Sequence, residues 1–164
     1  MIKLSDKPVR SILYVCTGNI FRSVVAEHAT KLQQGPNNLC RVGSAGIEAK
    51  PQSIHPWIQH YLRQKGVDVS KHVQRKLTRE LLEATDLVVA MSRDHQTFIR
   101  GEFGAEVPLF RQICCGRDEP ILDLHEVHPN WEQDLNLARN YVSSVIDMIW
   151  ADVRSLLSRL HHVR

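Results

Sequence analysis

The sequence lacks any apolar run long enough to span a bilayer, and its first residues, Met1 to Pro8, are polar where a signal peptide would need an apolar core. Cysteine is also scarce: the four cysteines form no regular framework, which is typical of a reducing compartment. We therefore expect a cytoplasmic protein without a membrane partner, and the sequence leaves open export by a route that needs no signal.

Two further features are missing from the 164 residues. No basic stretch is interleaved with aromatic residues, so we expect no nucleic-acid partner, and the net charge of +3 fits either a mixed surface or attraction of anionic substrates. No internal repeat or low-complexity linker divides the chain. Hydrophobic residues at 43% and charged residues at 24% are ordinary for a globular protein, and we expect a single domain over residues 1–164.

Short apolar runs alternate with helical patterns along the chain. Because short, fully apolar strands separated by helices are typical of a parallel sheet covered on both faces, we predict a three-layer, doubly wound α/β fold with four parallel strands. The predicted strands are Ser11–Val15, Leu39–Ser44, Leu87–Met91 and Val107–Phe110; the predicted helices are Val24–Gln34, Pro56–Lys65, Leu81–Ala84, the segment from Ser92 to Phe103, and Glu132–Leu160. Residues 111–130 show no clear periodicity and are predicted to be a long functional loop.

The segment Cys16-Thr17-Gly18-Asn19-Ile20-Phe21-Arg22-Ser23 stands between the first strand and the first helix. A tight loop that leads into a helix start gathers backbone N–H groups and the positive end of the helix dipole, and together they bind anions. Gly18 and Asn19 are residue types that tolerate the left-handed backbone such a loop requires. Cys16 would be a nucleophile whose thiolate these surroundings favour, and Arg22 would clamp a phosphate with its planar fork of donors.

This segment resembles the phosphate-binding loop of low-molecular-weight protein tyrosine phosphatases, whose pattern is Cys-x-Gly-Asn-x-x-Arg-Ser. Further resemblances follow in chain order at Gly43–Gly46, His55–Pro56, Gly66–His72, Lys76–Thr78 and Asp86–Met91 with His95. The resemblance implies strand order 2-1-3-4 and hydrolysis of protein phosphotyrosine through a phosphocysteine intermediate, without a metal or other cofactor. The implied partners are phosphotyrosine proteins, which can include a tyrosine kinase.

The resemblance also implies roles for individual residues. Residues 17–23 would bind the phosphate, and Asn19, Ser44 and His72 would form a polar network that supports the loop. Asp123 would be the general acid, since it lies where the family carries its acid loop, although Leu124 stands where the family usually has proline. Glu126 and Asp118 remain rivals for this role.

Several weaker signals have simpler explanations. The spacing of His125 and His128 could bind a metal, but no cysteine or second close pair accompanies them, so a solvent-exposed loop is the better interpretation. With Trp131, the two histidines could also line the substrate entrance. Cys114 and Cys115 could form a strained redox pair, and an ordinary pair of loop thiols is the simpler interpretation.

Two other functions stay open. A phosphate-binding module with a weakened acid loop would recognise phosphoproteins with little turnover. A thioredoxin-coupled arsenate reductase, which the resemblance also includes, would need further cysteines after the third strand. That place reads Met91-Ser92-Arg93-Asp94, which leaves only Cys114 and Cys115 to serve.

Overall fold

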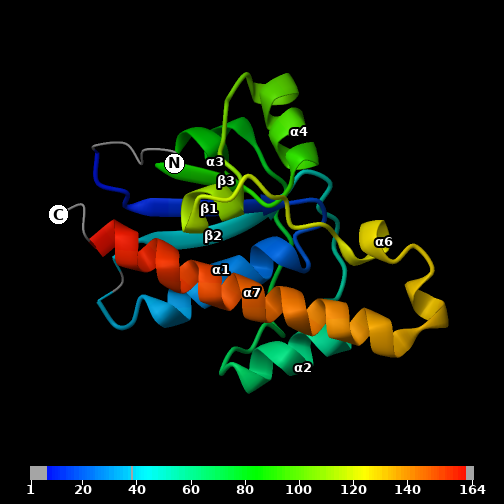
Figure 1. Cartoon of the computed structure of the whole chain (residues 1–164). Coiled ribbons are helices and arrows are strands. Elements are labelled where there is room, and N and C mark those ends of the chain that lie inside the picture. Colours follow the sequence, from blue (N-terminus) through cyan, green and yellow to red (C-terminus); the bar gives the residue numbers. More distant parts are fainter. Residues whose placement is uncertain (1–6, 38, 162–164) are drawn as a thin grey trace.

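The computed structural model describes residues 7–37 and 39–161, so most of the polar start predicted for Met1 to Pro8 lies outside the described residues. Its centre is a parallel sheet of three strands, β1 (Ser11–Cys16), β2 (Arg41–Gly46) and β3 (Leu87–Ala90). The strands lie in the order β2-β1-β3, so β1 is central (Figure 1). The first three predicted strands are therefore confirmed, as is their order.

Helices cover both faces of this sheet, as predicted. Helices α1, α2 and α7 lie on one side, and α3 and α4 lie on the other (Figure 1). The bounds are α1 Arg22–Gln33, α2 Pro56–Gln64, α3 Arg79–Glu83, α4 Arg93–Phe103, α5 Phe110–Cys115, α6 Leu124–Val127, the 3-10 turn η1 Trp131–Gln133, and α7 Leu135–His161. None of the helices among the described residues combines the length and apolar character needed to cross a membrane.

Strand β1 is buried along its whole length because helices pack against both faces of the sheet at this strand. Successive side chains of a strand point to opposite faces. Ile12 and Tyr14 accordingly pack into the cluster that includes residues of α1 and α7, whereas Leu13 and Val15 pack with Ile99 of α4. This burial on both faces explains why the strand reads as a continuous apolar run and places its carboxyl end, at Cys16, between the two layers.

The predicted fourth strand, Val107–Phe110, is wrong. In the part of the chain that the structure describes, this segment meets the sheet only at an isolated bridge between Ala90 and Leu109. The N–H of Ala90 donates to the carbonyl of Pro108 at 2.9 Å. Proline has no N–H to continue a ladder, and Phe110 already begins α5. The order 2-1-3-4 thus reduces to 2-1-3.

The segment 111–130 is also more regular than predicted. It contains most of α5, which ends at Gly116 with a left-handed φ of 72°, and all of α6. Helices of one or two turns are too short to show a hydrophobic period, which is why the sequence pattern missed them. The long final helix begins at Leu135 rather than Glu132, because Asp134 accepts the N–H of Leu137 at 3.0 Å and caps it.

Candidate active site

Cys16 lies at the junction of β1 and the loop that leads into α1. Its side chain is buried, and its Sγ lies 2.9 Å from the hydroxyl of Ser23. Helix α1 begins at Arg22, and its N-cap residue, Phe21, makes no side-chain hydrogen bond to the first turn. Since the first N–H groups of a helix have no partner within the helix, this uncapped end can bind an anion beside the thiol.

Asn19 gives the loop its turn. It has a φ of 55°, and it is the one non-glycine residue with positive φ in the described segments, while Gly18 is not left-handed. Both residue types tolerate this backbone, and Asn19 is the one of the two that adopts it. The carbonyl of Asn19 accepts from Nε2 of His72 at 3.0 Å, and its Oδ1 accepts the N–H of Arg75 at 3.1 Å. These bonds hold the turn from outside the loop.

The end of β2 must be glycine for the loop to fit. A Cβ atom built on Gly46 would lie 2.5 Å from the carbonyl oxygen of Thr17 and 2.9 Å from the nitrogen of Asn19. Both contacts involve backbone atoms and cannot be relieved by a side-chain rotation. Gly46 therefore allows the loop backbone to pack directly against the sheet.

A chain of hydrogen bonds runs from a buried carboxylate to the thiol. Ser44 donates to Oε1 of Glu27 at 2.6 Å, because a carboxylate can only accept. Asn19 then donates to Ser44 at 2.8 Å and to Ser23 at 3.0 Å. The hydroxyl proton of Ser23 is left for Cys16. Glu27 thus fixes the direction of the Ser44 hydroxyl, and Nδ2 of Asn19, which can only donate, fixes the other two bonds.

Glu27 is the member of this network that the sequence interpretation missed. Burial raises the pKa of its carboxyl, but hydrogen bonds from Lys31 and Ser44 outweigh burial and bring the pKa below the ordinary value. Lys31 lies one turn further on and contacts the carboxylate at 2.7 Å. The available signal was a glutamate one helical turn after Ser23, on the face of α1 that packs inward.

We expect Glu27→Gln to lower kcat about tenfold, because the amide can donate as well as accept and no longer orients the network. The variant should also be less stable near neutral pH. A carboxyl with a lowered folded-state pKa stabilises the fold above its unfolded pKa, here 4.5, and loses that stabilisation as the pH falls through the folded value. Thermal unfolding of both proteins from pH 7 to pH 3 checks this. A gap in melting temperature that stayed constant would contradict it.

Arg22 is buried beneath the segment that carries Asp123. Its Nη1 donates to the carbonyl of Ile121 at 2.8 Å, and its Nη2 lies 3.5 Å from Oδ2 of Asp123. The same Nη2 also lies 3.5 Å from Oγ1 of Thr17, in the loop. The structure thus brings the predicted clamp and the predicted acid together across about 100 residues of sequence.

The three candidate acids occupy different places. Asp123 caps α6 with Oδ1, which accepts the N–H of Leu124 at 2.8 Å, and its other oxygen faces Arg22. Glu126 accepts the N–H of Asp123 at 3.0 Å and so supports the Asp123 backbone. Asp118 instead accepts from Gln112 at 2.6 Å and pairs with Arg93. Of the three carboxylates, the one that contacts Arg22 is Asp123.

Tyr141 of α7 holds the segment that carries Asp123 in place. The sequence pattern did not reveal this role, because Tyr141 falls among the apolar residues that recur at helical spacing along α7. Its hydroxyl donates to the carbonyl of Leu122, next to Asp123. Burial raises the pKa of Tyr141 to about 12, with Arg22 opposing and Asp123 reinforcing the rise. The phenol therefore stays protonated and keeps donating at neutral pH.

An apolar cleft of about 200 Å³ opens beside the loop and Asp123. Its lining includes Ile20, Phe21, His55, Trp57, Leu124 and Trp131. The two indole rings meet edge to face, with centroids 6.1 Å apart, and His55 lies 4.5 Å from Trp57. His125 and Trp131 line this cleft as predicted, whereas the ring of His128 packs on Tyr141.

Metal and redox chemistry find little support in the side-chain placement. Within residues 7–37 and 39–161, no three potential ligands among His, Cys, Asp and Glu are grouped to hold a metal, and His125 lies 3.5 Å from Asp123 instead. The four cysteines do not form disulfides with one another. Burial raises the pKa of Cys114 well above its usual value, and the thiol of Cys115 donates to the carbonyl of Arg111.

Comparison with known proteins places the chain among phosphatases. Residues 11–163 match the family described as "Low molecular weight phosphotyrosine protein phosphatase". A protein-arginine-phosphatase of Bacillus subtilis is 39% identical over 119 residues, which cover 68% of this chain and 77% of that protein. A low molecular weight protein-tyrosine-phosphatase Ptp of Acinetobacter johnsonii is 38% identical over 91 residues, covering 55% and 62% of the two chains.

Other relatives extend the range of activities. Arsenate reductase 1 of Staphylococcus epidermidis is 34% identical over 85 residues, or 52% of this chain and 61% of that protein. Among solved structures, a YwlE mutant from Bacillus subtilis superimposes with a TM-score of 0.79 at 29% identity, covering 93% of this chain and 99% of that one. A YwlE arginine phosphatase mutant with a phosphorylated active-site serine gives 0.77 at 27% identity, covering 94% and 99%.

Proposed function

The chain belongs to the low molecular weight phosphotyrosine protein phosphatase family, and we propose that it hydrolyses phosphotyrosine in proteins, with Cys16 as nucleophile, Arg22 as phosphate clamp and Asp123 as general acid. The observation that carries this proposal is the meeting of two distant segments: the loop that holds the thiol of Cys16 and the guanidinium of Arg22 at the uncapped start of α1, and the segment that holds the carboxyl of Asp123.

In the first step, the thiolate of Cys16 attacks phosphorus, and an S–P bond forms as the P–O bond to the tyrosine breaks. The N–H groups at the start of α1 and the fork of Arg22 stabilise the negative charge on the phosphoryl oxygens. Asp123, in its acid form, gives its proton to the departing phenolate oxygen. The phenol leaves, and the phosphocysteine remains.

In the second step, water attacks phosphorus while the carboxylate of Asp123 takes one of its protons. The S–P bond breaks, phosphate leaves, and the thiolate of Cys16 is restored. Ser23 donates to this sulfur as it departs, in the direction that Glu27, Ser44 and Asn19 fix. Asp123 ends the cycle protonated, ready for the next substrate.

The cleft beside the loop supports an aromatic leaving group. Its lining is apolar and aromatic, and its one carboxylate, Asp123, already faces Arg22. A tyrosine ring can pack against Ile20 and the edges of Trp57 and Trp131. A phosphoarginine side chain would bring a guanidinium group into a cleft whose lining, among the described residues, holds no further carboxylate to pair with it.

Phosphoarginine is the second candidate substrate, because the protein-arginine-phosphatase of Bacillus subtilis shares 39% identity over 68% of this chain. Arsenate reduction is disfavoured for this chain, since Cys40 and Cys114 are buried and Cys115 is engaged with the backbone of its own helix. A phosphate-binding module without turnover is disfavoured by the contact between Arg22 and Asp123.

We expect kcat/KM for a phosphotyrosine peptide to exceed that for the same peptide with phosphoarginine by at least about tenfold, because the cleft stabilises an aromatic ring and leaves a guanidinium unpaired. Phosphate release from both peptides, with and without EDTA, is the measurement. The rates should not depend on EDTA. Preference for phosphoarginine would transfer the assignment to the second candidate, and loss of activity in EDTA with recovery in a divalent metal would contradict the mechanism.

A further inference from the structure

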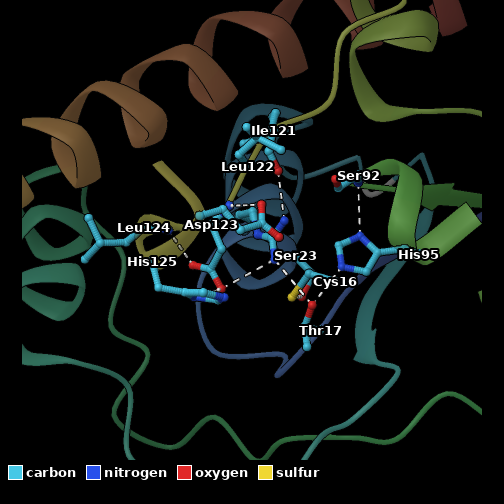
Figure 2. Close-up of polar contacts among 12 residues, drawn as sticks. Cys16, Thr17, Ser23, Ser92, His95, Ile121, Leu122, Asp123, Leu124 and His125 are labelled. Carbon is cyan, nitrogen blue, oxygen red and sulfur yellow. Dashed lines mark hydrogen bonds and ion pairs between the residues drawn. The ribbon is translucent and has the colours of Figure 1, made fainter. Parts of the chain in front are cut away.

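His95, near the start of α4, lies beside the phosphate-binding loop although 72 residues separate it from Ser23. The ring is almost fully buried. Its Nδ1 accepts the backbone N–H of Ser92 at 3.0 Å, and its Nε2 lies 3.0 Å from Oγ1 of Thr17 (Figure 2). Since Nδ1 accepts a hydrogen bond, the proton of a neutral ring must be on Nε2, which then donates to Thr17.

The protonation state of this ring follows from its surroundings. Burial, reinforced by the positive charge of Arg22, lowers the pKa of His95 to about 3. A protonated ring would also lose the hydrogen bond from Ser92, because both of its nitrogens would then be donors. The imidazole therefore remains neutral throughout the physiological range and keeps one orientation and one tautomer.

Thr17 consequently receives two donors on one oxygen. Nε2 of His95 lies 3.0 Å from Oγ1, and Nη2 of Arg22 lies 3.5 Å from the same atom. A hydroxyl can accept two hydrogen bonds and donate one. Among the residues that the structure describes, no acceptor takes the proton of Thr17, so this proton is available to a ligand.

The position of the Thr17 hydroxyl indicates what kind of ligand it would contact. Thr17 directly follows Cys16, and its Oγ1 and the carboxylate of Asp123 lie at the same distance, 3.5 Å, from one nitrogen of Arg22. The hydroxyl and the proposed acid thus both contact the proposed clamp, and the hydroxyl belongs to the residue next to the thiol. A tetrahedral oxyanion held by Arg22 would place an oxygen within reach of Thr17.

We propose that the hydroxyl of Thr17 donates a hydrogen bond to the phosphoryl group bound at this loop, and that His95 is a positioning residue that turns the hydroxyl toward that group. The proposal rests on the proposed function for the identity of the ligand. It adds a side-chain donor to the backbone N–H groups of the loop. It also explains why a buried, neutral histidine borders a loop that binds anions.

Thr17→Val removes the hydroxyl and keeps the shape of the side chain. We expect the inhibition constant of vanadate to rise, and kcat/KM for an aryl phosphate to fall, by about tenfold to a hundredfold, the range for a hydrogen bond to a charged group. Thr17→Ser should remain within about threefold of the native protein. The matched control is Thr85→Val, which removes a hydroxyl that donates to the carbonyl of Leu81, far along the chain from the loop.

His95→Gln tests the positioning role. It should weaken vanadate binding in the native background and have no further effect in Thr17→Val, because the histidine acts through that hydroxyl. Equal losses in both backgrounds would overturn the positioning role. Vanadate binding by Thr17→Val within twofold of native would overturn the whole proposal. Should Thr17→Val fail to fold, Thr17→Ala removes the same hydroxyl and is judged by the same criterion.

Calorimetric binding of vanadate distinguishes failure of this inference from failure of the proposed function. A native protein that binds vanadate but does not hydrolyse phosphotyrosine would contradict the proposed function, while the comparison of Thr17→Val with Thr17→Ser would still decide the role of the hydroxyl. A native protein that binds no vanadate would overturn both, since the loop would then hold no oxyanion.

Discussion

Replacing Cys16 by serine is expected to abolish turnover, with kcat reduced by roughly four or more orders of magnitude, because a serine hydroxyl at neutral pH is a far weaker nucleophile than a thiolate. The fold should survive, since a serine at position 16, the end of β1, can still contact the hydroxyl of Ser23. Single-turnover assays with an aryl phosphate, together with thermal unfolding, measure both quantities.

The matched control is Cys40→Ser. Cys40 is also a buried thiol, and its Sγ donates to the carbonyl of Val9, a bond that serine can reproduce. This control should keep nearly native activity. Arg22→Lys should lose about a hundredfold to a thousandfold in kcat, because a point charge replaces a fork that contacts both Ile121 and Asp123. Near-native turnover by Cys16→Ser would show that another residue is the nucleophile.

Replacing Asp123 by asparagine should lower kcat by roughly two to four orders of magnitude for an aryl phosphate with a poor leaving group, the usual scale of general acid catalysis. The loss should shrink as the pKa of the leaving group falls, because a good leaving group departs without a proton. The structure adds a reason to expect a folded variant: the Oδ1 of asparagine can still cap α6 by accepting the N–H of Leu124.

Two matched variants distinguish proton donation by Asp123 from the effect of removing any negative charge in the segment around it. Glu126→Gln should show no dependence on the leaving group, since Glu126 supports the backbone of Asp123. Asp118→Asn should behave likewise, because Asp118 pairs with Arg93 and Gln112. The decisive measurement is kcat against leaving-group pKa for the three variants. A steep new slope for Glu126→Gln, with Asp123→Asn unchanged, would transfer the role to Glu126.

The sequence by itself determined the central strand, the loop and the helix that follows. Ser11 to Val15 is apolar on both faces, which is the pattern of a strand buried between two layers, and Arg22 follows Cys16 at a spacing that one short loop can close. These features depend on residues that are neighbours in the chain. Local periodicity and the conformational preference of Asn19 were therefore sufficient to predict them, and of the two residues that tolerate left-handed backbone Asn19 is the one that adopts it.

Other features depended on the tertiary structure because they join distant residues or depend on a single contact. Pro108 looks like part of a strand, yet the lack of an N–H and the start of α5 leave only one bridge to the sheet. Glu27 reads as an exposed helix residue until the packing of α1 against β2 buries it against Ser44. The periodicity of hydrophobic residues in a sequence does not indicate which polar atoms come into contact when the chain folds.

The contacts around Arg22 and Thr17 also join residues that are distant in the sequence. Asp123 contacts Arg22 from the segment before α6, and His95 contacts Thr17 from the start of α4. Folding brings the carboxyl end of β1, the start of α4 beyond β3 and the acid segment to one edge of the sheet. The sequence singled out Cys16 and Arg22 as the proposed nucleophile and clamp, and the tertiary structure decided that Asp123 faces Arg22 and that His95 contacts Thr17.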